Sequence, residues 1–326
     1  MHSRILAKTN ASLSEIGLGC WQFGGDFGPI DDATVAEILD AAFSEGIRFF
    51  DTADVYGAGR SEQLIGDFLK RCPEKIFVAT KVGRGGELYP AGYTREATRA
   101  CIEASRKRLG VDAIDLIQLH CVPTAVLENG AIFDWLRDFQ KEGLIRSFGA
   151  SVETVEEGLL CLQQEELVSL QIIFNVFRQK PLNELLPKAQ SAGVGIIVRL
   201  PLASGLLAGK FKKDTAFDQT DHRNFNRNGA AFNVGETFAG LPFEKGVEFA
   251  DALKPYVSDG MTMAQWAQRW ILDCPAVTSI ITGASKPSQV KSNAAVSGLP
   301  ALSQEVHDSL AEYYQNSVAG YIRGPY

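Results

Sequence analysis

The sequence lacks the residue spacings that build metal and disulfide sites. Its six cysteines are scattered without a Cys-x-x-Cys pair, and its four histidines form neither a His-x-x-His nor a His-Glu-x-x-His pair. We therefore expect no metal site. Scattered cysteines, in a chain without a secretory leader at its N-terminus, indicate reduced thiols in a cytoplasmic protein.

Long apolar runs and an excess of basic residues are also missing. No stretch approaches the roughly 18 apolar residues that a membrane span needs. The formal net charge is -7, whereas phosphate-rich partners are bound by clustered basic side chains. We expect neither nucleic acid nor a membrane as a partner, and the oligomeric state stays open.

Two nucleotide-binding fingerprints are absent as well. Gly17 and Gly19 begin a Gly-x-Gly pattern, but Gln22 stands where a Gly-x-Gly-x-x-Gly fingerprint needs its third glycine. No Gly-x4-Gly-Lys-Ser/Thr loop occurs either. A doubly wound sheet and a P-loop fold thus lose their main support.

What the sequence does contain is an alternation of short apolar runs with longer segments of helical periodicity. Strands are predicted at 16–21, 47–51, 76–81, 114–120, 145–151, 167–175, 195–200 and 276–283. Helices are predicted near 31–45, 61–70, 94–109, 132–142, 152–161 and 182–191. Eight strands alternating with helices indicate a (β/α)8 TIM barrel of class α/β, although a doubly wound sheet could also hold eight strands. We expect one domain over 1–326, with an N-terminal β-hairpin.

A long insertion follows the seventh predicted strand. Residues 208–240 have poor periodicity and are rich in Asn, Gly, Phe and Arg. A structureless stretch of this length in a compact domain is usually functional or disordered. We expect a loop over the active face, anchored by four phenylalanines: Phe211, Phe217, Phe225 and Phe232.

Four titratable residues of different kinds stand at the ends of successive predicted strands. Asp51, Lys81 and His120 end three strands, and Tyr56 follows five residues after Asp51. In a barrel the carboxyl ends of the strands hold the active site. Lys81 would lower the pKa of Tyr56, Asp51 would keep Lys81 charged, and His120 would orient a substrate oxygen. Such a site would stabilise and protonate an oxyanion that develops on a carbonyl.

Each of these residues also has an ordinary structural explanation. A lysine at a strand end is more often a solvated charge, and a single histidine is more often satisfied by its neighbours. The functional interpretation therefore depends on finding all four residues together, in this order and on these strands.

Together the motifs resemble those of the bacterial-type aldo-keto reductases, along nearly the whole chain. The matching segments are FDTADVYG, ATK and DLIQLH, at 50–57, 79–81 and 115–120. They resemble the segments that carry the catalytic residues of that family, which correspond here to Asp51, Tyr56, Lys81 and His120. The resemblance implies a TIM barrel that transfers hydride from NADPH to an aldehyde or ketone without metal or flavin. In this family the tyrosine is the general acid.

The resemblance also implies where the nicotinamide end of the cofactor binds. Ser151 and Gln171 correspond to residues that hold the carboxamide, but Val152 replaces the usual neighbouring asparagine. Arg199 replaces the aromatic residue that stacks on the nicotinamide. A guanidinium plane can still stack, so we expect Arg199 to pack against the nicotinamide or to contact the pyrophosphate.

Two later segments match the family pattern for the rest of the cofactor. Ser204 and Lys210 would contact the pyrophosphate, Lys286 the 2′-phosphate, and Gln289 and Asn293 the adenine. Many relatives carry arginine where Ser285 stands, so NADH is an alternative to NADPH. The full set of expected cofactor contacts is Gly19, Cys20, Trp21, Ser151, Gln171, Arg199, Leu202, Ser204, Gly205, Lys210, Gly283, Ser285, Lys286, Gln289 and Asn293.

The leading interpretation is a cytoplasmic NADPH-dependent carbonyl reductase whose small-molecule substrate lies between Trp21, Tyr56 and His120. The same site could run in reverse, as an NAD(P)-dependent dehydrogenase of a sugar or alcohol. A third interpretation is a non-catalytic NADPH-binding redox sensor, similar to the potassium-channel β subunits that share this fold. The four filled catalytic positions favour an enzyme. The sequence does not define its substrate.

Overall fold

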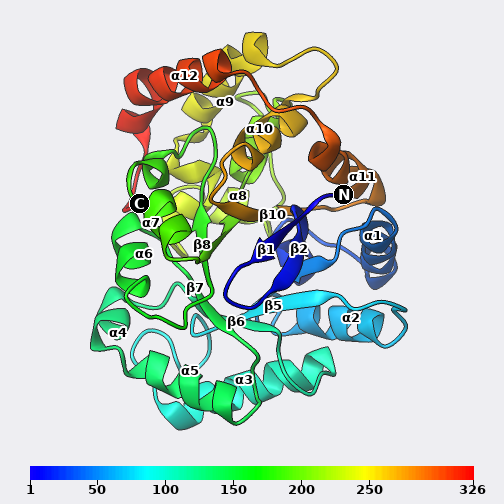
Figure 1. The fold of residues 1–326 in the computed structure, drawn as a ribbon. Helices are drawn as coiled ribbons and strands as arrows, with labels where there is room; N and C mark the ends of the chain where they lie inside the picture. Colours follow the sequence, from blue (N-terminus) through cyan, green and yellow to red (C-terminus); the bar gives the residue numbers. More distant parts are fainter.

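In the computed structural model, which describes residues 1–326, eight parallel strands close into a barrel (Figure 1). They are β3 (Ile16–Gly19), β4 (Phe49–Asp51), β5 (Phe77–Val82), β6 (Leu116–His120), β7 (Phe148–Ser151), β8 (Ser169–Ile173), β9 (Gly195–Arg199) and β10 (Val277–Gly283). Neighbours in this order are paired, and β10 pairs with β3 to close the ring. The predicted (β/α)8 barrel is confirmed.

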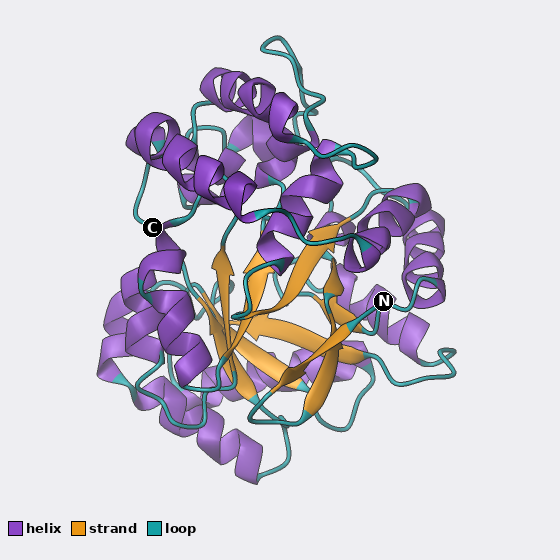
Figure 2. Cartoon of the chain, turned by 45° about the horizontal axis from the view of Figure 1, so that its top comes forward, coloured by secondary structure: helices purple, strands orange, loops and turns teal.

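Helices surround the strands, as Figure 2 shows in purple around orange. They are α1 (Asp32–Ser44), α2 (Arg60–Leu69), α3 (Arg95–Leu109), α4 (Thr124–Asn129), α5 (Ala131–Lys141), α6 (Val155–Cys161), α7 (Leu185–Ser191), α8 (His222–Phe225), α9 (Phe243–Leu253), α10 (Met263–Leu272), α11 (Pro287–Ala294) and α12 (Gln304–Tyr313). No helix was predicted at the positions of α4, α8, α9, α10 and α12.

Local side-chain chemistry sets the helix ends. Asp31 caps α1 by accepting a hydrogen bond from the Thr34 amide at 2.7 Å. Thr154 and Glu157 form a capping box. For this reason α6 begins at Val155 and not at Val152, where the periodicity alone would start it.

The amino ends of the barrel strands are covered by an antiparallel hairpin of β1 (Ser3–Leu6) and β2 (Ala11–Ser14). Leu6 and Leu13 are fully buried and pack against residues of the barrel interior that include Phe49 and Leu116. Figure 1 shows the hairpin, in dark blue, lying across the barrel. The predicted hairpin is therefore confirmed, and it leaves the opposite end of the barrel for function.

The insertion after β9 is more ordered than the sequence indicates. It contains α8 and two 3₁₀ turns, Val234–Glu236 and Phe238–Gly240. The Asn226 side chain folds it back on itself, because its amide nitrogen donates to Thr237 Oγ1 and its oxygen accepts from the amides of residues 231 and 232. Of the four predicted anchors, Phe225 is 39% exposed and does not serve as one.

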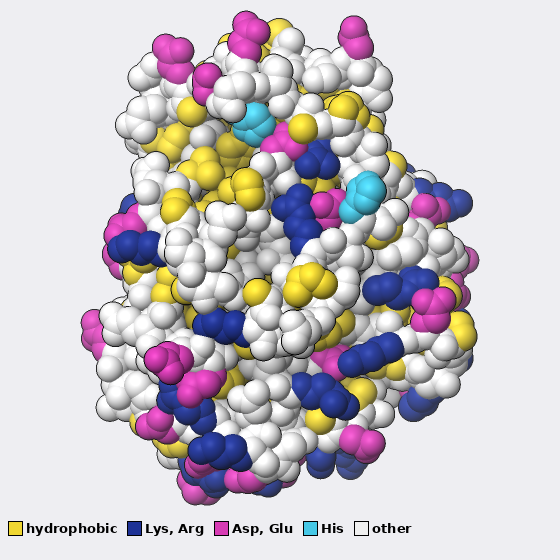
Figure 3. All heavy atoms as spheres, viewed as in Figure 1, with side chains coloured by type: hydrophobic (Ala, Val, Ile, Leu, Met, Phe, Trp, Pro, Cys, Tyr) yellow, Lys and Arg dark blue, Asp and Glu magenta, His cyan; other side chains and the backbone are white.

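No helix is both long and apolar enough to cross a membrane. On the face seen in Figure 3, lysine and arginine side chains are interspersed with aspartate and glutamate. That face carries no large area of one sign. The expectation of no nucleic-acid partner nevertheless stays a prediction.

Candidate active site

The carboxyl ends of the barrel strands surround a cavity of about 520 Å³. Asp51, His120 and Arg199 line it from the ends of β4, β6 and β9. Tyr56 lines it from the loop that follows β4. A cavity of this size is in the range of small-molecule sites.

Lys81 is buried and contacts both Asp51 and Tyr56. It is 1% exposed, and its Nζ lies 2.5 Å from Asp51 Oδ1, 2.8 Å from the Thr52 carbonyl and 3.3 Å from the Tyr56 hydroxyl. Because Ala79 of β5 pairs with Asp51 of β4, Lys81 stands two residues further along, on the same face of the strand. The cation predicted for Tyr56 is therefore within hydrogen-bond reach of it.

Two further side chains donate hydrogen bonds to Asp51, and neither bond was predicted from the sequence. Gln171 Nε2 donates to Asp51 Oδ2 at 2.7 Å, and Gln118 Nε2 donates to the same oxygen at 3.1 Å. Both of its carboxylate oxygens are thus satisfied in a buried position, as a charge there requires. Gln171, expected at the nicotinamide, is bonded to Asp51 in this structure.

Burial raises the pKa of Tyr56 to about 12, although the Lys81 ammonium lowers it. Lys81 thus acts in the predicted direction, but the net shift of the Tyr56 pKa is upward. Desolvation of the phenolate outweighs the neighbouring positive charge. Tyr56 consequently keeps its proton at neutral pH.

His120 is neutral in this environment. Burial, and then the positive charges of Arg84, Lys81 and Arg199, lower the pKa of His120 well below its usual value. Its Nδ1 is buried without a partner, and its ring lies edge-on to Tyr56 with centroids 6.0 Å apart. A neutral imidazole can donate a single hydrogen bond to a substrate oxygen.

Trp21, just beyond β3, forms the wall next to Tyr56. The two rings are stacked at 6.0 Å with an interplanar angle of 21°. The Trp21 indole nitrogen donates to Asp26 Oδ2 at 2.7 Å, which fixes the ring. Phe232 of the insertion also lines the cavity, and its ring centroid lies 6.1 Å from that of Trp21, so the insertion completes this wall.

The model of the Aldo/keto reductase family matches residues 15–315. The chain belongs to the aldo/keto reductase family. It is therefore an NAD(P)H-dependent oxidoreductase.

Several members of the aldo/keto reductase family align with almost the full chain. The NADH-specific methylglyoxal reductase of Escherichia coli is 31% identical and aligns over 89% of this chain and 91% of that protein. The oxidoreductase YqkF of Bacillus subtilis is 29% identical over 98% of both chains. The solved structure of the glycerol dehydrogenase AKR11B4 from Gluconobacter oxydans superposes with a TM-score of 0.78 at 29% identity, covering 99% of this chain and 97% of that one.

Most of the residues expected to bind the cofactor line the cavity of this aldo/keto reductase. They are Gly19, Cys20, Trp21, Gln171, Arg199, Leu202, Ser204, Gly205, Lys210, Gly283, Ser285 and Gln289. The cavity thus extends from His120 at the end of β6 to the amino end of α11. Three lining residues, Gln22, His120 and Arg199, each have a buried side-chain atom without a hydrogen-bond partner. A polar ligand that spans the cavity, as a nicotinamide dinucleotide would, could supply those partners.

Three of the expected cofactor residues do not line the cavity. Ser151 is buried with its Oγ 3.5 Å from Gln171 Oε1. Asn293 is buried and its Oδ1 accepts from Gln268 at 3.2 Å, so a contact with adenine would require this bond to open. Lys286 is exposed at the start of α11 and forms no ion pair. The cofactor roles of these residues stay predictions.

Two of the three departures from the family pattern, Val152 and Arg199, lie in contact with each other. Arg199 Nη2 donates to the backbone carbonyl of Val152 at 3.2 Å and lies 3.6 Å from Cys121 Sγ. Although burial opposes its charge, Cys121 and Glu236 raise the pKa of Arg199. The side chain therefore stays charged on the cavity wall.

Arg199 is one member of a buried ion-pair cluster. Glu236 Oε1, from the insertion, lies 2.6 Å from Arg84 Nη1 and 3.4 Å from Arg199 Nη1. Glu153 Oε1 lies 3.8 Å from Arg84. Although burial favours its neutral form, Arg84 and Arg199 lower the pKa of Glu236. We therefore treat Glu236 as an ionised carboxylate.

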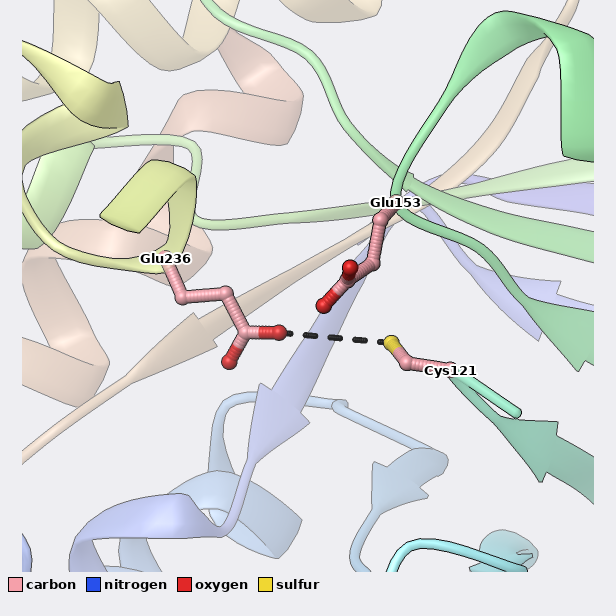
Figure 4. A group of neighbouring side chains, drawn as sticks. All are labelled: Cys121, Glu153 and Glu236. Carbon is pink, nitrogen blue, oxygen red and sulfur yellow. Dashed lines mark hydrogen bonds between the residues drawn. The ribbon is translucent and has the colours of Figure 1, made fainter. Parts of the chain in front are cut away.

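Figure 4 shows Cys121, Glu153 and Glu236 converging, with potential ligand atoms within 4.8 Å of one another. Two arginines already compensate these carboxylates. Burial also raises the pKa of Cys121 to about 11, so its thiol stays protonated at neutral pH. The group is an ion-pair cluster in this structure, and the absence of a metal stays a prediction.

Sequence reasoning missed Gln118, Arg84, Asp26 and Glu236. Gln118 shares the face of His120 on an alternating strand, so its inward direction could have been inferred. Arg84 follows shortly after a strand end, as site residues often do. Glu236 lies in the irregular insertion, where no periodicity predicts the direction of a side chain.

Proposed function

We propose that the chain reduces aldehydes or ketones with NADPH. The observation that supports this most strongly is the contact of the Tyr56 hydroxyl with Lys81 at 3.3 Å, where Lys81 is paired with Asp51 at 2.5 Å. A protonated tyrosine beside a fixed cation is a general acid whose conjugate base is stabilised.

Each polar residue at the end of the cavity then has a role. Bound NADPH would supply the hydride for the carbonyl carbon. Tyr56 holds the proton for the carbonyl oxygen, and Lys81 stabilises the phenolate that remains. Asp51 keeps Lys81 charged and in place, while His120 orients the carbonyl oxygen.

Preference for NADPH over NADH is proposed from Lys286, which is exposed and free of ion pairs. Because one relative is named as NADH-specific, the preference of this chain for NADPH over NADH needs to be measured. We expect Lys286→Ala to raise the apparent KM for NADPH about 10-fold, the loss of one charge-assisted contact, without changing that for NADH. Lys291→Ala, on the same helix, is the control. Equal effects of Lys286→Ala on both cofactors would contradict the assignment.

Oxidation of an alcohol is the second candidate, because a glycerol dehydrogenase superposes on nearly the whole chain. A panel of aldehydes, ketones, sugars and pyridoxal with NADPH, together with the matching alcohols and NADP+, would give kcat/KM in both directions. Turnover in neither direction, with tight binding of NADPH, would favour the redox sensor. The cytoplasmic location stays a prediction.

A further inference from the structure

The charge on the cavity wall bears on which oxidation state of the cofactor binds more tightly. Oxidised and reduced nicotinamide dinucleotides differ by one hydride, so the oxidised ring carries one more positive charge. Their phosphates and riboses are the same. A charged side chain near the ring therefore changes the ratio of the two affinities, whereas contacts to the phosphates change both affinities alike.

Arg199 lies where it would act on the ring, if the proposed function holds. Hydride transfer requires the ring within about 3.5 Å of the carbonyl carbon. The carbonyl oxygen must reach Tyr56 and His120. Arg199 lines the same cavity and lies 3.6 Å from Cys121 Sγ, the residue next to His120. Its Nε is buried without a partner.

Glu236 compensates the charge of Arg199 from across the barrel mouth. Its carboxylate lies between Arg199, at the end of β9, and Arg84, which follows β5. β5 and β9 are four strands apart in the ring of eight, and so lie on opposite sides. Glu153 is 3.8 Å from Arg84. With both glutamates ionised, the two arginines and two glutamates carry no net charge.

We propose that Glu236, by neutralising Arg199, sets the relative affinity of the site for oxidised and reduced cofactor. With Glu236 ionised, an oxidised nicotinamide meets a neutral cluster, and the site accepts both oxidation states. Without that carboxylate, Arg199 repels the oxidised ring and leaves the reduced ring unaffected. The residue thereby influences which direction of the reaction the enzyme favours.

The test is the ratio of dissociation constants for NADP+ and NADPH, measured by calorimetry and by cofactor fluorescence in the absence of substrate. Two charges about 6 Å apart at an effective dielectric constant of ~20 interact strongly enough to change this ratio by a factor of roughly 100. We expect Glu236→Gln to raise the NADP+/NADPH ratio at least about 10-fold. Glu248→Gln removes an exposed carboxylate paired with Lys213 and Lys245 on α9, and we expect no change.

A second variant keeps the proposal testable if Glu236→Gln does not fold. Arg199→Met removes the positive charge, and we expect it to lower the ratio. The double variant should return the ratio toward that of the wild type. Unchanged ratios in the variants that fold and bind both cofactor forms would overturn the proposal. Failure of the wild type to bind either form would instead overturn the proposed function, and this inference with it.

Discussion

At the scale of single residues, Asp51 is held in the site by hydrogen bonds from three other strands. It accepts hydrogen bonds from Lys81, Gln118 and Gln171, which stand on β5, β6 and β8. A buried carboxylate with fully used oxygens is held in one orientation. Lys81 is in turn aimed at Tyr56, so the position of the proton donor depends on this buried network.

Asp54, three residues further on, has no such partners. Its Oδ1 is buried without a hydrogen bond, and burial together with the charge of Glu62 raises the pKa of Asp54 from 3.8 to about 7. A carboxyl whose pKa is raised on folding stabilises the fold below its unfolded pKa, and that stabilisation is lost as the pH rises to 7. Asp54→Asn should therefore increase the free energy of unfolding, relative to wild type, by about 2 kcal/mol more at pH 8 than at pH 5.

Urea denaturation at the two pH values measures this difference. Asp67→Asn, an exposed carboxylate paired with Lys70, is the control and should show no such gain at pH 8. If Asp54→Asn destabilised the protein equally at both pH values, the conclusion that folding raises the pKa of Asp54 would be wrong.

The residues of the site were predictable to the extent that they end strands. Asp51, Lys81 and His120 could be found from their positions, and Tyr56 from its spacing after Asp51. The sign of the pKa shift of Tyr56 could not, because it depends on how completely three-dimensional packing removes water from the ring. Glu236 could not either, because its partner Arg84 lies 152 residues away.

At the scale of elements, the 3₁₀ turn Trp21–Gly24 packs directly on the loop that carries Tyr56. A Cβ placed on Gly24 would lie 2.7 Å from the Gly57 nitrogen and 2.9 Å from the Tyr56 carbonyl carbon. Gly24 does not have a positive φ, so alanine is excluded by space and not by conformation. The close approach of the two backbones therefore depends on glycine at this position.

Gly24→Ala should shift Tyr56 and lower kcat at least about 10-fold, because displacements near 1 Å in an active site cost up to a hundredfold. The dissociation constant for NADPH should change much less than kcat, because Trp21 is the only expected cofactor contact on this turn and the other expected contacts lie outside it. Gly298→Ala is the matched control, as no atom lies within 4 Å of its added Cβ. A folded Gly24→Ala variant with normal kcat would refute this role of the turn.

The eight barrel strands and the helices that follow the first six of them were predictable from periodicity, and the ends of these helices were not. Helix α6 starts late because Thr154 caps it, and α4 is too short to show a helical period. The insertion was predicted as structureless because the contacts of Asn226 that fold it join residues up to 11 positions apart. Such contacts leave no pattern in a local window.

At the scale of the whole molecule, the segment near residue 323 holds the insertion in place. Arg323 donates from its guanidinium to the carbonyls of Gly240, Arg227 and Leu241 and to Asn228 Oδ1, at 2.9 to 3.1 Å. These bonds fix the part of the insertion that presents Glu236 and Phe232 to the cavity. The far end of the chain thus helps to shape the site.

Arg323→Ala should loosen the insertion. We expect amide hydrogen exchange over 226–241 to become at least about 10-fold faster, equivalent to roughly 1.4 kcal/mol of local stability and within the cost of losing charged hydrogen bonds. Arg71→Ala, which removes an exposed pair with Asp40, should leave this region unchanged. Exchange at the wild-type rate in Arg323→Ala would show that other contacts hold the insertion.

The barrel itself was predictable from its eight alternating units and from the missing dinucleotide fingerprint. How distant segments meet over its mouth was not. The hairpin closes one end through Leu6 and Leu13, and the insertion partly covers the other through Glu236. Only the second closure determines the chemistry of the cavity, and it depends on contacts between residues far apart in the sequence.

In the proposed reaction Tyr56 gives the proton to the carbonyl oxygen. The most direct measurement is the single-turnover rate of NADPH oxidation by Tyr56→Phe with the best aldehyde of the panel, alongside its affinity for NADPH. The phenyl ring keeps the packing against Trp21 but has no proton to give. We predict unchanged NADPH binding with a rate lowered about 10²–10⁴-fold, the usual contribution of general acid catalysis. A rate close to that of the wild type would show that another group donates the proton.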